Sequence, residues 1–399
     1  KSAPEVLEGS SNKYQNWELF DPEKWVPEGY VLVRVDSRGA GRSEGFLEVW
    51  SPREAKDIAL SVDWAGVQPW SNGKVGLHGI SYYSMNQWQA APLKPKHLAA
   101  LCIWEGSSDY YRELCRHGGI LSDFFSTWYP RQVTAVQNGV GDRGAKSAVT
   151  GEPVAGPDTL SEAQLKKNRA DCDGDALRHR LIDDYHQARL PKFEDIETPL
   201  FSAANWGGMG LHPRGNFEGF LRTGSKQKWL EVHGDTHFTL FYAKYGHDLQ
   251  KKFFDHFLKG LDNGWDKQPK VLLNVRHPDE KFVQRAENEW PLARTQWTKL
   301  YLHPDRELCN DPPTDQAMPP RSAERVSHGS GSCGAATPLS STRIVRCSRS
   351  TDSGTVRTGS LGVKPSRGSR ARERIWPKPS VKSSTTATRS GCGVGSSVV

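Results

Sequence analysis

The sequence predicts an α/β fold in which helices cover both faces of a mostly parallel sheet. Between residues 30 and 104, short β-branched or apolar runs alternate with segments whose apolar residues recur at helical spacing. Turns rich in glycine, proline or asparagine separate these segments, as is typical of α/β domains. The longest apolar run, residues 98–104, is much shorter than the roughly 20 residues of a membrane-spanning helix, and the mean hydropathy is −0.66. We therefore expect no membrane span.

The first part of the chain is predicted to contain a strand, a helix, a strand, a helix and a strand, over residues 30–35, 53–64, 74–78, 81–91 and 97–104. In the first of these helices, Ile58 and Val62 lie four residues apart and therefore share one face. The second helix follows the strand that ends at His78 so closely that the chain must turn very sharply. Parallel strands need crossover helices of this kind, so the alternation favours a parallel sheet.

Changes in composition predict the domain boundaries. Residues 1–104 are the first part of the sheet domain, which is incomplete at its N-terminus, and residues 196–265 are its second part. Residues 105–195 are rich in aromatic side chains without a convincing strand, and we expect a helical cap insertion there. The strands and the closing helix of the second part are expected at residues 199–203, 228–232 and 248–258. Residues 266–308 alternate like the start of an incomplete C-terminal β domain, and residues 309–399 are expected to be a disordered tail.

The net charge of +7 comes from the end of the chain. Residues 321–399 contain 14 Lys and Arg against 3 Asp and Glu, which leaves residues 1–320 with a net charge of −4. This end is rich in serine, arginine, glycine and threonine, and Trp376 is its only aromatic residue, so it cannot bury enough apolar surface to fold. The charge therefore does not indicate a folded nucleic-acid-binding surface, and a nucleic-acid-binding tail is the less favoured alternative.

The cysteines and the first residues bear on the compartment. The seven cysteines include no Cys-x-x-Cys pair, so neither a zinc site nor a disulfide framework is predicted, and a reducing compartment such as the cytoplasm is favoured. The chain starts at Lys1 without the apolar core of a secretory signal, and we interpret its beginning as truncated or processed.

Ser81 lies where a predicted strand meets a predicted helix, in Gly79-Ile80-Ser81-Tyr82-Tyr83-Ser84. A nucleophilic serine needs this place, because a strained strand-to-helix turn exposes the hydroxyl while N–H groups at the helix start face the developing oxyanion. The segment departs from Gly-x-Ser-x-Gly, since Tyr83 stands where the second glycine is expected. The alternative interpretation is that Ser81 only caps the helix.

Four segments together resemble the cocaine-esterase-like (CocE/NonD) hydrolases, which are relatives of the X-prolyl dipeptidyl peptidases. They are residues 35–45 (VDSRGAGRSEG), 70–76 (WSNGKVG), 79–89 (GISYYSMNQWQ) and 251–259 (KKFFDHFLK). The resemblance extends over residues 14–302. It implies an α/β-hydrolase domain, a helical cap inserted after the strand that follows the nucleophile helix, and a C-terminal jelly-roll domain, which has no counterpart in this sequence.

By this resemblance Ser81 is the nucleophile, and the backbone N–H of Tyr82 contributes to the oxyanion hole. His237, just past the predicted strand at residues 228–232, is the general base, and His233 is its rival.

The sequence offers several candidates for the acid of the triad. Family members carry an aspartate after a tryptophan in the loop that corresponds to residues 205–210 (NWGGMG), where glycine and methionine stand here. The acid must orient the imidazole and stabilise its cation. Asp109, which follows the strand ending at Trp104, is the predicted acid, and Asp235 and Glu218 are the alternatives. Each of these three could instead be a solvated loop carboxylate.

Two other motifs suggest different chemistry and are weaker. His233 and His237 are four residues apart, which on a helix could place two metal ligands on one face, but Gly234 between them argues against a helix. The glycines of residues 36–41 (DSRGAG) lack the spacing of a dinucleotide-binding loop, so a structural turn is favoured there. No metal and no cofactor is therefore predicted.

These observations predict a serine hydrolase that cleaves an ester or amide bond, including the dipeptidyl bond of a peptide, through an acyl-enzyme intermediate. The expected partner is a small ester or amide substrate or a short peptide, with no nucleic acid and no membrane, and a homo-oligomer stays open. The alternative is a catalytically impaired remnant of such a hydrolase, truncated and shifted in reading frame after about residue 302. Translation of the DNA in its other two frames tests that alternative.

Overall fold

The structure is a computed structural model that describes residues 4–208, 210–303, 307–313 and 395–398. It divides into two compact units, Lys1–Thr295 with Ser383–Val399, and Gln296–Lys382. In the described part of the second unit, β10 (Tyr301–Leu302) pairs antiparallel with β11 (Leu308–Cys309). Most of the predicted disordered tail, residues 314–394, lies outside the described residues.

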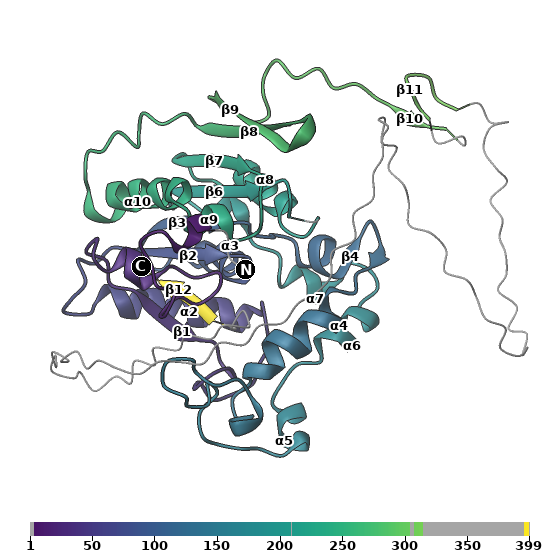
Figure 1. Ribbon diagram of the computed structural model, residues 1–399. Helices are drawn as coiled ribbons and strands as arrows, with labels where there is room; N and C mark the ends of the chain where they lie inside the picture. The colour runs from purple at the N-terminus through teal and green to yellow at the C-terminus, as the bar shows by residue number, and fades with distance from the viewer. Residues whose placement is uncertain (1–3, 209, 304–306, 314–394, 399) are drawn as a thin grey trace, which may run out of the picture. The chain divides into compact units, whose positions relative to one another are not determined.

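The first unit is built on a sheet whose eight described strands lie in the order β1, β12, β2, β3, β6, β7, β8, β9 (Figure 1). Their bounds are β1 Val33–Asp36, β2 Val75–Ile80, β3 Leu98–Trp104, β6 Leu200–Asn205, β7 Lys228–His233, β8 Val271–His277, β9 Lys281–Glu287 and β12 Gly395–Val398. Strands β2, β3, β6, β7 and β8 are parallel to one another, whereas β9 and β12 run antiparallel to their neighbours. The predicted mostly parallel sheet is confirmed.

Helices cover both faces of this sheet, as predicted. The longer ones are α2 (Pro52–Gly66), α3 (Tyr82–Ala90), α8 (Pro213–Arg222) and α10 (Lys244–Lys259) (Figure 1). Successive residues of a strand point to opposite faces. Accordingly, Cys102 and Trp104 of β3 belong to the same buried cluster as Phe254 of α10, whereas Ile103 belongs to a cluster with Val62 of α2.

The start of α2 shows how local sequence sets a helix boundary. Ser51 is the N-cap, and its side chain accepts a hydrogen bond from the backbone N–H of Glu54. Pro52 follows at the first helical position, where the N–H that proline lacks has no partner within the helix. The helix therefore begins one residue before the predicted range of 53–64.

The segment between β3 and β6 is made of short elements. They are η3 (Tyr110–Cys115), β4 (Arg116–His117), β5 (Ile120–Leu121), α4 (Phe124–Trp128), η4 (Tyr129–Val133), η5 (Thr134–Val136), η6 (Gly141–Arg143), α5 (Glu162–Lys167), α6 (Cys172–Arg178), α7 (Asp184–Gln187) and η7 (Phe193–Asp195). Leu114 and Phe125 share a buried cluster with Tyr82 and Met85 of α3, so this cap packs over the helix that follows Ser81. The cap is mainly helical, but β4 and β5 pair antiparallel. Two-residue strands are too short to show a periodic pattern in the sequence.

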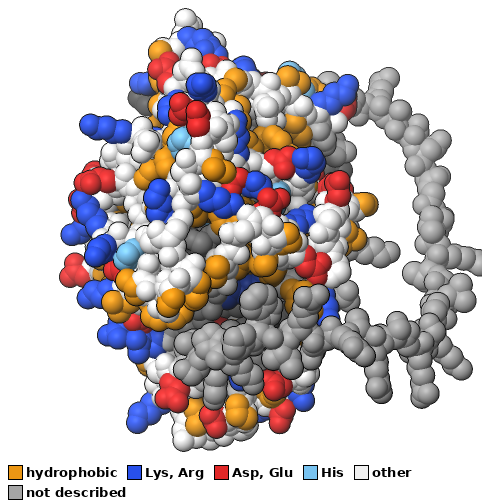
Figure 2. Space-filling view, turned by 90° about the vertical axis from the view of Figure 1, so that its left-hand side faces the viewer, with side chains coloured by type: hydrophobic (Ala, Val, Ile, Leu, Met, Phe, Trp, Pro, Cys, Tyr) orange, Lys and Arg blue, Asp and Glu red, His pale blue; other side chains and the backbone are white. Residues whose placement is uncertain are grey.

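The remaining short helices of the first unit are η1 (Pro4–Leu7), α1 (Pro22–Trp25), η2 (Ala91–Leu93), α9 (Thr239–Tyr242) and η8 (Pro278–Glu280). On the face shown in Figure 2, Lys and Arg side chains are interspersed with Asp and Glu, and this face carries no continuous basic patch. Within the described residues, no helix combines the length and the apolar character that crossing a bilayer requires.

Two predictions about the end of the chain need correction. The first concerns residues 266–308: β8 pairs parallel with β7, and its Val271 and Leu273 pack against Val232, so β8 and β9 extend the central sheet instead of starting a separate domain. The second concerns the tail, because β12 pairs antiparallel with β1 and β2. Backbone hydrogen bonds to two neighbouring strands can order four residues that composition alone marks as unable to fold.

Candidate active site

Ser81 lies at the end of β2, directly before α3, and its backbone is strained. Its φ of 55° and ψ of −112° fall in a region that residues with a side chain rarely adopt. Gly79 permits this turn, because a Cβ at that position would lie 2.5 Å from the Cβ of Tyr83. Ser81 stands at the N-cap position of α3, but its hydroxyl makes no capping hydrogen bond there, so side-chain capping does not account for this serine. The turn instead presents the hydroxyl at the carboxyl edge of the parallel strands.

Tyr82 is anchored to α2 by its side chain. It is the first residue of α3, so its backbone N–H is among those that have no partner within the helix. Its hydroxyl donates to the two carboxylate oxygens of Glu54, at 2.6 and 2.8 Å. Glu54 is buried and also accepts hydrogen bonds from the Ser37 hydroxyl and the backbone N–H of Trp50. These contacts hold the predicted oxyanion donor beside Ser81.

The hydroxyl of Ser81 is hydrogen-bonded to His212, which the sequence analysis did not single out. The Oγ of Ser81 lies 2.9 Å from the Nε2 of His212. His212 is the buried residue directly before α8, in the loop that follows β6. Its ring is stacked on that of His237, with ring centroids 4.9 Å apart and planes at 14°. Ser81 and His237 therefore belong to one cluster, in which His212 contacts both.

Glu105 is the carboxylate that holds His237. It follows β3 directly and its side chain is fully buried. Its Oε2 lies 2.6 Å from the Nδ1 of His237, while the Nε2 of His237 lies 3.1 Å from the Oε1 of Glu18. An acid at Nδ1 orients an imidazole and stabilises its cation. Glu105 has the contact that the sequence analysis expected of Asp109.

His233, the predicted rival of His237, lies behind Glu105. Its Nε2 is 3.3 Å from the Oε1 of Glu105, and its Nδ1 is 2.6 Å from the Oε2 of Glu231. Asn205 also donates to the Oε1 of Glu105, at 3.1 Å. The side chains of His233, Glu105 and Glu231 are fully buried. Carboxylates and imidazoles therefore alternate in a continuous hydrogen-bonded series from Glu231 through His237 to Glu18.

Burial and neighbouring charges shift the pKa values of Glu105 and His237 in opposite directions. Burial alone would raise the pKa of Glu105, but hydrogen bonds with His233 and His237 outweigh it and lower the pKa to about 2. Burial alone would lower the pKa of His237, but its hydrogen bonds to Glu105 and Glu18 raise it. For His212, burial and then the charge of His237 lower the pKa to about 3. Near neutral pH, His237 is therefore charged and His212 is neutral.

Asp109, the predicted acid, has other partners. It caps η3 by accepting a hydrogen bond from the N–H of Arg112, and its carboxylate forms an ion pair with the guanidinium of Arg112 at 2.6 Å. Asp109 stays a prediction for the acid, while Glu105, which follows the same strand, β3, makes the contact with His237. Glu105 could have been singled out from the sequence, because it is the carboxylate that directly follows this central strand.

The alternative acids also have other partners. Glu218 lies 3.7 Å from the guanidinium of Arg214, one helical turn before it in α8. Asp235 accepts a hydrogen bond from the N–H of Thr236. Among the described residues, the hydrogen bonds and ion pairs of His237 involve neither of them.

A row of aromatic rings extends from Tyr82 into the cap. Trp128 stacks on Trp50, with centroids 5.0 Å apart, and Phe124 stacks on Trp128 at 5.2 Å. The rings of Tyr82 and Trp128 are also stacked, at 6.0 Å. Tyr82 and Trp50 are buried and Trp128 and Phe124 are partly buried, so this row of rings packs the cap against α3.

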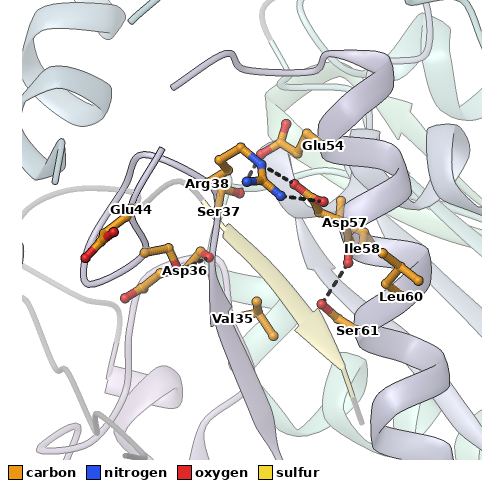
Figure 3. Close-up of a pocket in the computed structure, with 11 residues that line it drawn as sticks. Val35, Asp36, Ser37, Arg38, Glu44, Glu54, Asp57, Ile58, Leu60 and Ser61 are labelled. Atoms are coloured by element: carbon orange, nitrogen blue, oxygen red, sulfur yellow. Dashed lines mark hydrogen bonds and ion pairs between the residues drawn. The ribbon is translucent and has the colours of Figure 1, made fainter. Parts of the chain in front are cut away.

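The glycine-rich loop after β1 borders a cavity of about 390 Å³, which lies beside Glu54 (Figure 3). Ser81 and its histidines are not part of its lining. Arg38 and Asp57 in its wall form an ion pair at 2.9 Å. A Cβ at Gly41 would lie 2.2 Å from the carboxylate of Asp36, so packing within the turn explains this glycine. The geometry agrees with the predicted structural turn.

One group among the described residues has donor atoms close enough for a metal. Glu105, His212 and His237 each offer one atom within 4.8 Å of the others. A histidine ligand binds a metal through a lone pair in the plane of its ring. The rings of His212 and His237 are stacked and nearly parallel, so these lone pairs do not converge on one ion. We do not assign these residues as metal ligands; their arrangement suits proton transfer.

Comparison with known proteins assigns the first three fifths of the chain to a hydrolase family. Residues 5–239 match the X-Pro dipeptidyl-peptidase (S15) family. Cocaine esterase from Rhodococcus sp. is 27% identical over 344 residues, which cover 73% of this chain and 54% of the esterase. A protein of Rhodopirellula baltica whose name assigns it to the Xaa-Pro dipeptidyl-peptidases is 24% identical over 310 residues, which cover 70% of this chain and 45% of the relative.

Solved structures agree with these sequence matches. Two crystal structures of a CocE/NonD family hydrolase from Staphylococcus aureus match with a TM-score of 0.63, at 36% and 37% identity. The match covers 74% of this chain and 49% of the other. The chain thus spans about half the length of the relatives that it matches.

Proposed function

The chain belongs to the X-Pro dipeptidyl-peptidase (S15) family, and we propose that it is a serine hydrolase that cleaves an ester or amide bond through an acyl-enzyme intermediate. The observation that carries this proposal is the strained turn at Ser81, whose hydroxyl lies 2.9 Å from His212 in a cluster that includes His237. Relatives are named as an esterase and as a dipeptidyl-peptidase. The proposed substrate is therefore a small ester or amide or a short peptide.

In the proposed mechanism, the Oγ of Ser81 attacks the carbonyl carbon while the Nε2 of His237 accepts the hydroxyl proton. Glu105, at Nδ1 of His237, stabilises the imidazolium that forms. The backbone N–H of Tyr82 donates to the oxyanion. His237 then gives the proton to the leaving group, and the acyl-enzyme is hydrolysed when His237 activates a water molecule in the same way.

Two contacts must change before the first proton transfer. The hydroxyl of Ser81 is bonded to His212, and the Nε2 of His237 is bonded to Glu18. The Nε2 of His237 must also lose its proton to solvent. Glu18 then releases Nε2, the hydroxyl turns from His212 to His237, and the nucleophile meets a neutral base. Catalytic hydrogen bonds of this kind are often completed only in the complex with substrate.

A fluorophosphonate probe tests the proposal, because it modifies only a serine that a base activates. We expect the wild-type chain to be labelled and the Ser81→Ala variant to be unlabelled. Ser126→Ala is the matched control, since Ser126 is exposed and, among the residues that the structure describes, its hydroxyl donates only to the backbone carbonyl of Asp123 within the cap. Equal labelling of Ser81→Ala and wild type would contradict the assignment. Absence of labelling in a folded wild-type chain would favour the impaired remnant.

A further inference from the structure

Glu18 is a buried carboxylate at the nitrogen of His237 that the proposed mechanism needs free. Its side chain comes from the segment before α1, and the residue is only 4% exposed. Its Oε1 lies 3.1 Å from the Nε2 of His237. Its Oε2 is buried and has no hydrogen-bond partner among the described residues. A carboxylate buried in this way is costly unless a positive charge lies beside it, and His237 provides that charge.

The backbone of Glu18 is fixed to the strand that carries Ser81. Its carbonyl accepts a hydrogen bond from the N–H of Ile80 in β2, at 2.9 Å. A Cβ at Gly79 would lie 3.1 Å from the same carbonyl. Glu18 also has a φ of 67°, which is rare for a residue with a side chain. Such strain persists only where the surroundings hold it, and it gathers at functional sites.

The charged and titratable groups around His237 are Glu105, Glu18, His212 and His233. Glu105, at the end of β3, lies at Nδ1, and Glu18 lies at Nε2. His212, before α8, stacks on the ring and is neutral, and His233 of β7 acts through Glu105. With a carboxylate at each nitrogen, both nitrogens of His237 carry a proton. In this form His237 cannot accept the proton of Ser81.

We propose that Glu18 sets the pH above which Ser81 becomes reactive, by holding the Nε2 of His237 in its protonated, hydrogen-bonded form. This inference rests on the proposed function and adds a positioning residue to it. An opposite charge within about 4–6 Å shifts a pKa by roughly 1–3 units toward the charged form. Removal of the charge at Glu18 therefore lets His237 lose its proton at lower pH. The acid limb, which is the pH range over which the reactivity of Ser81 rises as His237 loses its proton, moves to lower pH by about that amount.

The rate of fluorophosphonate labelling, measured against pH, tests this inference. Glu18→Gln keeps the size of the side chain and removes its charge. We expect its acid limb to lie about 1–3 pH units below that of wild type, so that on the acid side of the wild-type limb the variant is labelled at least ~10-fold faster. Glu8→Gln, an exposed glutamate of the same segment, is the matched control and keeps the wild-type profile. If folded Glu18→Gln is labelled at Ser81 but its acid limb lies at the same pH as that of wild type, this inference is wrong, whereas the proposed function still holds.

A second measurement does not depend on reactivity. Titration of His237 by ¹⁵N nuclear magnetic resonance, in Ser81→Ala and in Ser81→Ala with Glu18→Gln, reports its protonation directly. We expect both ring nitrogens of His237 to be protonated at pH 7 when Glu18 is present, and the titration to shift to lower pH without it. A neutral His237 at pH 7 in the Ser81→Ala protein would overturn the inference, whatever the labelling shows, including when Glu18→Gln fails to fold.

Discussion

Glu105 and Asp109 lie four residues apart, yet only Glu105 is bonded to His237. Glu105 follows β3 directly, and β3 lies between β2 and β6 in the sheet, so its side chain starts beside the strand that carries Ser81. Asp109 comes after the chain has left the sheet, where it caps η3. The sequence could indicate a carboxylate after this strand, but which of two nearby carboxylates contacts His237 depends on where the chain bends, and no local pattern in the sequence specifies that.

Substitution of these two acids gives the first prediction. Glu105→Gln should slow labelling of Ser81 by at least ~100-fold, because an amide cannot stabilise the imidazolium or fix its tautomer. Asp109→Asn should stay within about 3-fold of wild type, because asparagine caps a helix about as well as aspartate and the ion pair with the half-exposed Arg112 contributes little. Labelling rates at equal folded fraction, checked by thermal unfolding, measure both. The reverse order of effects would contradict the assignment of Glu105.

Two histidines compete for the role of base, and their substitution gives the second prediction. His237→Gln should slow labelling by ~100-fold or more, the usual contribution of a general base. His212→Gln should keep the rate within about 10-fold, because His212 holds the resting hydroxyl but is made a weak base by burial and by the neighbouring charge. A large loss in His212→Gln together with a small one in His237→Gln would show that His212 accepts the proton.

His212 itself could not be recognised from the sequence. It lies just beyond residues 205–210, the loop in which the resemblance leads one to look for an acid. The sequence places His212 near the position of the expected aspartate, but only the distance to Ser81 in the structure shows that it belongs to the site. Glu18 shows the same limit, since it lies 63 residues before Ser81 and reaches the site through long-range packing.

At the scale of elements, the turn between β2 and α3 was predictable because its residues are contiguous. The strand, the serine and the helix start follow one another, and the structure bears out the very sharp turn between them. The pairing of β4 with β5 and the place of β12 were not predictable. A strand of two to four residues has almost no periodicity, and its position depends on backbone partners elsewhere in the chain.

The turn gives the third prediction. Gly79→Ala should lower the free energy of unfolding by at least about 2 kcal/mol, because φ at Gly79 is 148° and the new Cβ would meet Tyr83. Gly264→Ala is the matched control: its φ is also positive, at 73°, but no atom lies within 4 Å of the new Cβ. Its expected cost is only about 1 kcal/mol. Urea unfolding measures both, and equal costs would show that the turn at Gly79 is not tightly packed.

At the scale of the whole molecule, the buried cluster links stability to pH. Carboxylate partners outweigh burial and raise the folded-state pKa of His233 to about 9 and of His237 to about 10. Their contribution to stability is complete below the unfolded value of ~6.5 and is lost as the pH rises through the folded values. The lowered pKa of Glu105 contributes stability above ~4.3, which is lost as the pH falls toward 2. His233, His237 and Glu105 together therefore stabilise the fold most between about pH 4.5 and 6.5. His212, whose pKa is lowered to about 3, contributes stability above ~6.5 that is lost as the pH falls.

This relation gives the fourth prediction. The free energy of unfolding in urea should fall as the pH rises from 6.5 toward 9, while Ser81 becomes more reactive over the same range. The opposite trends share one cause, because the proton that stabilises His237 between its carboxylates also blocks its role as a base. A Glu18→Gln variant should show a smaller fall in stability between pH 6.5 and 9. An equal fall in variant and wild type would argue against this link.

The fold class could be predicted from the alternation of strand and helix patterns, because helices that cross between parallel strands repeat along the sequence. The candidate site draws Glu18, Ser81, Glu105, His212 and His237 from across more than half of the chain, so its composition required the folded structure. The charge balance of the last residues predicted an unfolded tail, and β12 corrects that prediction for Gly395–Val398.

The central claim is that Ser81 forms an acyl-enzyme. The most direct measurement is to mix the protein with an activated ester that leaves a stable acyl group, quench with acid during turnover, and map the adduct by peptide mass spectrometry. We predict one added acyl group on the peptide that contains Ser81, and none in Ser81→Ala. An adduct on another residue of the chain, or turnover of the ester with no adduct at Ser81, would contradict the account.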